Sequence, residues 1–289
     1  MKKQLFHTLW AVAATLLLVA CGTPQKPIDP QTIYVSIAPL KGLVEGIVGE
    51  DFPIEVLVPA GASPETFEPT PRQLIAVNEA QWLFAVGLID FEQELLSRMA
   101  HQERIIPLHR GIELIEGHCA HHHSHEHPHA HGIDPHIWTS PRALQQMAAN
   151  LYEVIHAAYP DSVRYSNNYA TMQEKLRQLD LDVASALAIC PRTSFMVYHP
   201  ALTYYARDYG LEQLAIEQEG KEPSARHLAR LIEQARVQGI PCILYQRQYP
   251  RSSVEALARD MDAEAVEFDP LDEDICGMIR QITHQITSK

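Results

Sequence analysis

The feature that most constrains the fold is an alternation of strands and helices that occurs twice, on either side of one long helical segment. Short apolar segments bounded by turn residues predict the strands, and segments with helical periodicity separate them. In the first half, strands are expected at residues 33–38, 53–58, 82–86 and 104–108, and helices at 40–48, 71–80 and 91–100. In the second half, strands are expected at 194–198, 214–217, 242–245 and 265–268, and helices at 202–209, 224–238, 250–261 and 272–288. Such alternation is typical of parallel sheets covered by helices on both faces.

Two consecutive helices are expected between these halves, at residues 141–159 and 162–189. Pro160 breaks the pattern, and Asp161 can cap the second helix. The second segment has apolar side chains at helical spacing along its length. We therefore predict an α/β fold with two βα lobes, residues 32–161 and 190–289, whose parallel sheets are joined by one long backbone helix. A single continuous sheet through both halves would contradict this prediction.

The first 31 residues predict export and lipid anchoring. Residues 1–3 include two lysines, and residues 9–20 form an apolar run that is too short to span a bilayer comfortably. The sequence Leu-Val-Ala-Cys ending at Cys21 resembles a bacterial lipobox, which predicts cleavage before Cys21 and lipidation of its sulfur. Residues 1–20 are expected to be a signal peptide and residues 21–31 a lipidated tether. An ordinary signal peptide followed by an incidental cysteine is the alternative.

The rest of the chain predicts a globular body outside the cytoplasm, in the periplasm or at the cell surface. A hydrophobic fraction of 46% can fill a core. The formal charge of −13 becomes −15 when the two leader lysines are removed. A protein this acidic is not expected to bind nucleic acid.

Four cysteines remain besides Cys21: Cys119, Cys190, Cys242 and Cys276. An extracytoplasmic compartment permits disulfides, and four thiols allow three full pairings. In the common doubly wound order, the first and third strands of the second half are neighbours. This order would place Cys190 and Cys242 at the same end of one sheet, so a Cys190–Cys242 bond is the candidate pairing.

A histidine-rich segment, residues 117–132, interrupts the first half. Eight of the chain's 16 histidines lie in it, namely His118, His121, His122, His123, His125, His127, His129 and His131. The segment has no apolar periodicity, so we do not expect it to pack against a core. Neutral imidazole is the commonest protein ligand of late first-row metals, and a dense run of imidazoles is typical of a metal-binding tract. We predict an auxiliary loop that gathers divalent metal, and a solvated insert or tag is the alternative.

Four further residues are candidate metal ligands: Glu65, His136, His199 and Asp269. Each follows a predicted strand or lies in a loop between a strand and a helix, and two come from each half. Ligands of parallel sheets bind beyond the carboxyl ends of the strands, so these side chains could converge in a cleft between the lobes. Two imidazoles and two carboxylates suit a divalent ion. Taken singly, each is more often a solvated loop residue, a core histidine or a helix cap.

Motifs distributed along the whole mature chain carry a family resemblance. They are the lipobox, residues 59–71, the histidine-rich segment, Asp134-Pro135-His136, Tyr198-His199-Pro200, and residues 204–210, 219–224, 246–249 and 268–271. Together they resemble the zinc- and manganese-binding lipoproteins of ABC importers, the ZnuA/TroA-like (cluster A-I) substrate-binding proteins. The resemblance implies two βα lobes joined by one long helix, with a metal between them that is handed to a membrane permease. It also implies that the chain is not an enzyme.

One position departs from the family pattern. The residue after Pro64 is normally a ligating histidine in this family, and here it is Glu65. His136, His199 and Asp269 carry over as ligands. Manganese binders of the family also use two imidazoles and two carboxylates, so Mn²⁺ is not excluded, but the histidine-rich loop is associated with zinc and favours Zn²⁺. Either Glu65 binds the metal directly, or a loop histidine such as His131 takes its place.

We therefore expect a monomeric zinc-binding lipoprotein, anchored to a membrane outside the cytoplasm, that delivers divalent metal to an ABC permease. A manganese-selective protein of the same type is the first alternative. A zinc-dependent hydrolase with Glu65 as its base is the second, and turnover assays would identify it. A metal buffer or adhesin that uses only the histidine-rich loop is the third, and it would show several weak sites and no tight one.

Overall fold

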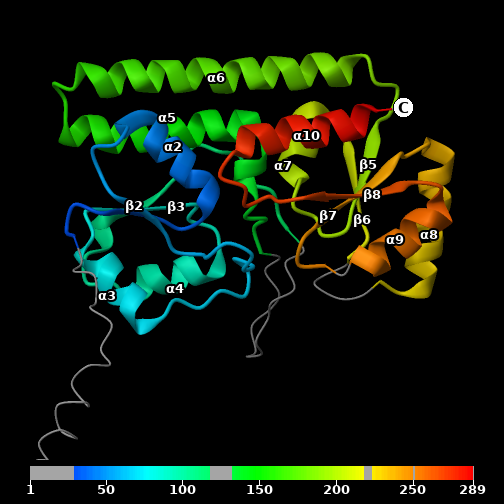
Figure 1. Cartoon of the computed structure of the whole chain (residues 1–289), viewed down its shortest axis with the longest axis horizontal. Helices are drawn as coiled ribbons and strands as arrows, with labels where there is room; N and C mark the ends of the chain where they lie inside the picture. The colour runs from blue at the N-terminus through cyan, green and yellow to red at the C-terminus, as the bar shows by residue number, and fades with distance from the viewer. Residues whose placement is uncertain (1–28, 118–131, 218–222, 250, 289) are drawn as a thin grey trace, which may run out of the picture.

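The computed structural model describes residues 29–117, 132–217, 223–249 and 251–288, which form two lobes beneath one long helix (Figure 1). Each lobe contains one four-stranded sheet within these residues, and all strand pairs are parallel. The first sheet has the order β2-β1-β3-β4, with β1 (Ile33–Val35), β2 (Ile54–Val56), β3 (Trp82–Ala85) and β4 (Ile105–Pro107). The second has the order β6-β5-β7-β8, with β5 (Ser194–Val197), β6 (Glu212–Ala215), β7 (Cys242–Gln246) and β8 (Glu264–Phe268). The two separate sheets confirm the predicted fold class.

Helices cover both faces of each sheet, as the alternation predicts. Those of the first half are α2 (Ala38–Val48), α3 (Pro71–Glu79), α4 (Asp90–Arg98) and α5 (Pro141–Ala158), with short 3₁₀ turns η1 (Gln102–Arg104) and η2 (Ile137–Thr139). Those of the second half are α7 (Thr203–Tyr209), α8 (Ala225–Gln238), α9 (Arg251–Met261) and α10 (Ile275–Thr287).

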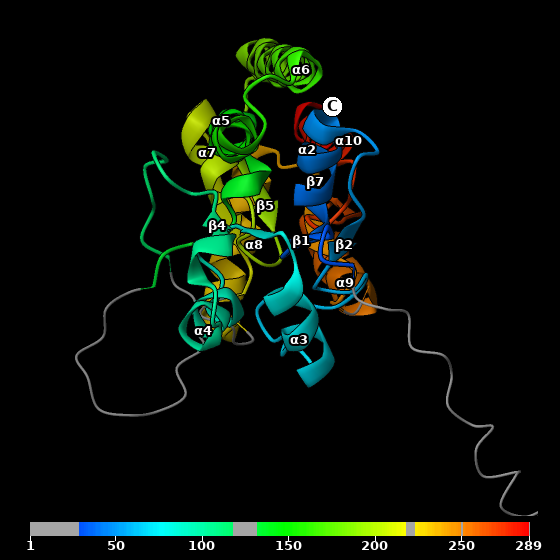
Figure 2. The ribbon, with the colours of Figure 1, turned by 90° about the vertical axis from the view of Figure 1, so that its left-hand side faces the viewer.

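The long helix α6 (Val163–Ala188) joins the halves. It packs against α2 and α5 of the first half and against α10 of the second, and it lies beyond these helices at the outer edge of the molecule (Figure 2). Ser162, and not Asp161, caps it, because the Ser162 hydroxyl accepts the backbone N–H of Tyr165. The bridging helix therefore contacts both lobes along its length.

The hydrophobic core is continuous between the lobes. Successive side chains of a strand point to opposite faces of a sheet, so β7 contributes to two clusters. Leu244 faces the cluster that also contains Phe84 of the first lobe, Leu176 of α6 and Ile279 of α10. Ile243 faces a smaller cluster under α8 and α9. One face of the second sheet is thus part of the first lobe's core.

The candidate Cys190–Cys242 disulfide is not formed, so that prediction is wrong for this structure. Strands β5 and β7 are neighbours, as expected, but Cys190, Cys242 and Cys276 are free thiols. The Cys190 Sγ lies 3.9 Å from the carbonyl oxygen of Ile286, and the Cys242 Sγ lies 3.8 Å from that of Gln285. Each thiol therefore faces a backbone carbonyl of α10. Burial raises the pKa of the Cys242 thiol to about 12.

Several predicted features lie outside the described residues. They are the signal peptide, Cys21 and most of the tether, Cys119 and all eight histidines of residues 118–131. Among the helices that are described, none has the length and apolar character needed to cross a membrane. The predicted lobe boundaries stay predictions.

Candidate metal centre

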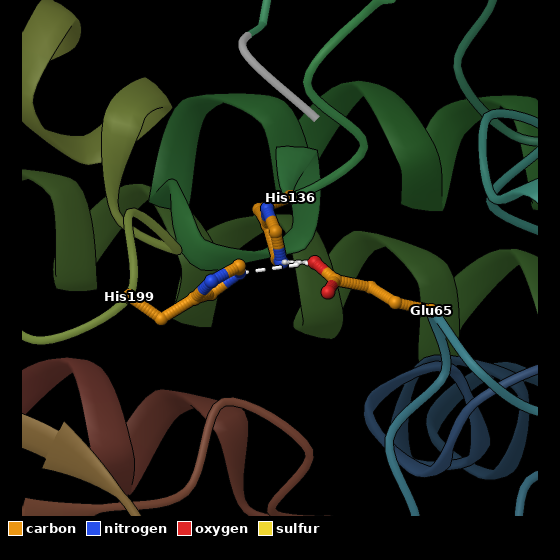
Figure 3. Close-up of side chains that lie close together, drawn as sticks. All are labelled: Glu65, His136 and His199. Carbon is orange, nitrogen blue, oxygen red and sulfur yellow. Dashed lines mark ion pairs between the residues drawn. The ribbon is translucent and has the colours of Figure 1, made fainter. Parts of the chain in front are cut away.

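Glu65, His136 and His199 face one another between the lobes (Figure 3). The Glu65 Oε1 lies 3.0 Å from the His199 Nε2 and 3.9 Å from the His136 Nε2. One ligand atom from each residue lies within 4.8 Å of the other two. Zinc bonds to nitrogen and oxygen are about 2 Å long, so a small inward shift would let all three atoms bind one ion. The structure thus brings together three of the four predicted ligands.

A loop that is fixed at several points holds Glu65. It follows β2 and turns where the Ala62 N–H donates to the Pro59 carbonyl, next to Gly61, whose φ of 82° favours glycine. Farther on, the Phe67 ring packs edge-on against Phe91 of α4, with ring centroids 5.1 Å apart. The turn thus shapes the chain before Glu65, and the Phe67–Phe91 contact holds the chain after it against α4.

The loop is also closed at its ends. Thr70 and Gln73 form a reciprocal capping box at the start of α3. The Gln73 side chain donates in addition to the Leu57 carbonyl, at 3.0 Å, just after β2. The helix start and the strand end are therefore joined, so the Glu65 carboxylate has a defined place at the sheet edge.

Asp134 orients the His136 ring. One oxygen of its carboxylate accepts both the backbone N–H and the Nδ1–H of His136, each at 2.9 Å. Both residues are buried. Burial opposes the negative charge, but the charge of His136 and its hydrogen bonds prevail and lower the pKa of Asp134. With Nδ1 held in this way, His136 presents Nε2 to the cluster.

Glu217 does the same for His199. The His199 Nδ1–H donates to the Glu217 Oε2 at 3.1 Å, and the Tyr249 hydroxyl donates to the same oxygen at 2.7 Å. The two residues are neighbours because the Glu217 N–H bonds the Tyr198 carbonyl beyond β5 and β6. Burial disfavours a charged His199, but its hydrogen bonds to Glu217 and Glu65 outweigh burial and raise its pKa to about 10.

The carboxylate partners of His136 and His199 are typical of metal-binding histidines. Histidines that bind metals usually donate their other ring N–H to a carboxylate or carbonyl, which fixes the tautomer and strengthens the ligand. Both histidines here have such a carboxylate partner. In the metal-free protein at neutral pH, His199 is an imidazolium between two carboxylates. A metal must displace its proton, because only neutral imidazole coordinates.

Asp269 lies in the same cavity but outside the three-residue cluster. Its Oδ1 accepts the backbone N–H of Leu271 at 2.9 Å, in the turn after β8. It does not cap α10, because Asp274 has that position. Arg247 follows β7 beside it, and its pKa is raised by Glu267 first and also by Asp269. Binding of metal by Asp269 stays a prediction.

Sequence reasoning missed Asp134, Glu217 and Gln246 as site residues. Asp134 had a signal, since a carboxylate two residues before a histidine can reach back to its ring. Gln246 lines the cavity, and its Nε2 donates to the His199 carbonyl at 3.2 Å. Its buried Oε1 has no hydrogen-bond partner within the described part of the chain. A buried acceptor of this kind suits a bound water or ion in the cavity.

Comparisons with known proteins agree with this geometry. A solved ZnuA crystal structure is 32% identical, with a TM-score of 0.79, covering 90% of this chain and 98% of that one. A zinc-bound ZnuA deletion mutant is also 32% identical, with a TM-score of 0.78, covering 90% and 97%. The high-affinity zinc uptake system protein ZnuA of Bacillus subtilis is 27% identical over 281 residues, which is 91% of this chain and 88% of that protein.

Longer relatives match as well. The zinc-binding protein AdcA of Streptococcus pyogenes is 27% identical over 258 residues, 83% of this chain and 50% of that protein. The chain thus spans about half the length of such relatives. None of the relatives named here is described as an enzyme, in agreement with the prediction. Residues 33–289 match the family described as zinc-uptake complex component A, periplasmic. The chain therefore belongs to the ZnuA family of zinc-uptake substrate-binding proteins.

Proposed function

We propose that this protein captures one zinc ion between its lobes, outside the cytoplasm, and releases it to an ABC permease. One observation carries the proposal: two imidazoles face the Glu65 carboxylate, and each imidazole is oriented by a further carboxylate of its own, Asp134 for His136 and Glu217 for His199. This donor set suits a late first-row metal that binds through neutral nitrogen. The zinc-binding names of the relatives support zinc as the cargo.

The proposed protein ligands are Glu65, His136, His199 and Asp269. The ligand atoms of the first three lie within 4.8 Å of one another, so a small inward shift would let them bind one ion. Asp269 lines the same cavity and would complete a four-coordinate site after a shift of its side chain. A water molecule or a loop histidine at the fourth position is the alternative. Asp269→Asn separates these cases, because the substitution should lower the zinc affinity strongly only if Asp269 is a direct ligand.

We propose Zn²⁺ over Mn²⁺ as the cargo. Imidazole nitrogen suits zinc, whereas carboxylate oxygen suits harder ions such as Mn²⁺. The two histidines therefore favour zinc, and Glu65, in place of the family's usual histidine, moderates that preference. Manganese should bind the same site more weakly.

The remaining parts of the proposal concern delivery. Lipidation of Cys21 would hold the monomer at the membrane that contains the permease, and the tether would allow it to reach the permease. The histidine-rich loop would gather zinc near the cleft, because the ends of the loop, at Gly117 and Gly132, lie close to the Asp134–His136 segment.

Metal analysis and competition titration test this function. Protein purified without chelator should contain about one tightly bound zinc, and Zn²⁺ should displace Mn²⁺ at equilibrium. His199→Gln should abolish the tight site, while His284→Gln, an exposed histidine of α10, should leave it intact. Several weak zinc equivalents without a tight one would contradict the proposal and favour a metal buffer.

A further inference from the structure

Helix α7 of the second lobe reaches the segment of the first lobe that carries His136. The Tyr204 side chain is fully buried there. Its hydroxyl accepts the backbone N–H of Ile115 at 3.2 Å and donates to the backbone carbonyl of Asp134 at 2.7 Å. One hydroxyl therefore joins the two chain segments that flank the histidine-rich loop.

Asp134 connects this hydroxyl to the cluster of candidate metal ligands. Its backbone carbonyl bonds Tyr204, and its carboxylate bonds both the N–H and the ring of His136. The contacts thus form a chain from Tyr204 through Asp134 to His136. His199 lies just before α7 in the sequence, so one short stretch of the second lobe supplies one histidine and supports the other.

We infer that Tyr204 is a positioning residue of the metal site, which holds Asp134 from the opposite lobe so that the His136 ring faces His199 and Glu65. This inference rests on the proposed function. Without the hydroxyl, the buried Asp134 carbonyl and the partly buried Ile115 N–H each lose a hydrogen bond, which is costly when no water replaces it. Asp134 would then shift to find other partners, and His136 would lose its fixed orientation.

Arg207 supports the same contact from α7. Its Nη1–H donates to the Glu113 carbonyl at 2.6 Å, and its guanidinium lies 5.1 Å from the centroid of the Tyr204 ring. Arg207 therefore contacts both the Tyr204 ring and the chain before Ile115.

The neighbouring residue provides a matched control. Tyr205 is equally buried, and its hydroxyl bonds the Thr283 Oγ1 of α10 at 2.8 Å. It does not line the cavity, and its hydroxyl bonds Thr283 instead of the His136 segment. Tyr205→Phe removes the same atom from the same helix without a route to the metal.

The test compares zinc dissociation constants and Co²⁺ absorption spectra of the wild type, Tyr204→Phe and Tyr205→Phe. Changes to groups that orient a metal ligand typically weaken binding about 10- to 100-fold, so we expect about a tenfold loss for Tyr204→Phe. We also expect altered Co²⁺ ligand-field bands for that variant. Tyr205→Phe should keep the wild-type constant and spectrum even if it unfolds at a lower temperature. An unchanged Tyr204→Phe, or equal losses in both variants, would overturn the inference.

A double-mutant cycle identifies the route. In an Asp134→Asn background, Tyr204→Phe should lower the zinc affinity by much less than tenfold, because the carboxylate that Tyr204 positions is already gone. Fully additive losses would show that Tyr204 acts by another path, contrary to the inference. If Tyr204→Phe fails to fold, Arg207→Met replaces it, with a smaller loss expected and an unchanged constant again contradicting the inference.

Zinc binding by the wild type distinguishes failure of the proposed function from failure of the inference about Tyr204. A wild type without a tight zinc site would sink the proposed function and this inference together. A wild type that binds zinc tightly, with Tyr204→Phe equal to it in affinity and spectrum, would sink only the inference.

Discussion

At the scale of single residues, the proton on His199 links this imidazole to two carboxylates, and a metal bound to His199 would replace that proton. His199 donates to Glu65 and to Glu217, so its positive charge lies between two carboxylates. The repulsion between Glu65 and Glu217 is reduced as long as that charge remains. A divalent cation that displaces the proton brings more charge to the same place, and therefore binding and proton release occur together.

Glu65 is the proposed ligand whose replacement says most about metal preference. Glu65→Ala should weaken zinc and manganese by about 100-fold or more, at least as much as the loss of an orienting partner. Glu65→His adds a nitrogen donor and should tighten zinc more than manganese. Competition titrations with both metals measure these changes. Glu68→Ala removes an exposed carboxylate from the same loop and should change neither constant. Unchanged zinc affinity in Glu65→Ala would make a loop histidine or water the better candidate ligand.

The dependence on pH follows from His199. Its pKa of about 10 lies above the ordinary value of 6.5, so it stabilises the metal-free fold fully below pH 6.5 and loses this contribution as pH rises through 10. Zinc binding has the opposite trend, because the metal replaces the proton. Affinity should rise about tenfold per pH unit between pH 7 and 9 from this group alone.

Calorimetry in buffers of different ionisation enthalpy measures the released proton. At pH 8, His199 should release about one proton per zinc. Glu217→Gln removes one of the two anions that raise its pKa, so this release should shrink and zinc affinity should fall about tenfold. Glu255→Gln, which removes an exposed partner of Arg251 in the same lobe, should alter neither quantity. Equal proton release in wild type and Glu217→Gln would refute the assigned pairing.

The residues that orient the ligands were harder to predict than the ligands. Glu65, His136 and His199 follow predicted strands or lie in loops between a strand and a helix, so the topology of parallel sheets indicated that they could converge. The same reasoning also included Asp269, which lies outside the three-residue cluster. Glu217 is 18 positions from His199 and depends on the pairing of β5 with β6, which the spacing of residues does not reveal. Tyr204 lies 70 positions from Asp134, in the other lobe.

At the scale of elements, the sequence predicted the order of helices and strands but not all of their ends. β6 was expected at residues 214–217, where the apolar residues are, and it occupies Glu212–Ala215. It is an edge strand that pairs with β5 in register from Ser194 opposite Glu212, so its polar residues take part in the ladder. Hydrogen bonding to a neighbour decides such ends, and hydrophobicity alone does not show them.

We expect that removal of the histidine-rich loop would disturb the fold little. Its ends are already joined, because the Gly117 N–H bonds the Gly132 carbonyl at 2.6 Å and Glu116 bridges Ile133. Deleting residues 118–131 and closing the gap with a two-residue turn should remove several weak zinc equivalents and keep one tight site. Weak sites are expected of a sequence without apolar periodicity, because binding by such a sequence costs conformational entropy that a preformed cleft avoids.

Equilibrium dialysis over a wide range of zinc concentrations counts both classes of site. Replacing the eight loop histidines with serine at constant length is the matched control, and it should reproduce the deletion. Loss of the tight site in both variants would mean that a loop histidine is a direct ligand.

At the scale of the whole molecule, the continuous core predicts one cooperative unfolding transition. Leu176 of α6 is fully buried in the cluster that contains residues of both lobes. Leu176→Ala should lower the free energy of unfolding by about 2–5 kcal/mol and shift the protection of β1 and β7 amides together. Hydrogen exchange in denaturant measures both strands. Leu181→Ala, on the same helix with 45% of the residue exposed, should have a much smaller effect. Separate transitions for the two strands would show that the lobes fold independently.

The side chain of Trp138 lies where the two lobes and the metal cluster meet. Its ring centroid is 5.2 Å from that of His136, and its indole N–H donates to the Pro270 carbonyl of the second lobe at 2.7 Å. Trp82, the other described tryptophan, packs with Phe52 and Tyr159 in the first lobe. A paramagnetic ion such as Cu²⁺ or Co²⁺ at His136 would quench the emission of the nearby indole by energy or electron transfer, which falls steeply with distance. Trp138 emission can therefore report, in real time and without a dye, that such a probe ion occupies the site, whereas Zn²⁺, with its filled d shell, would not quench it by this route.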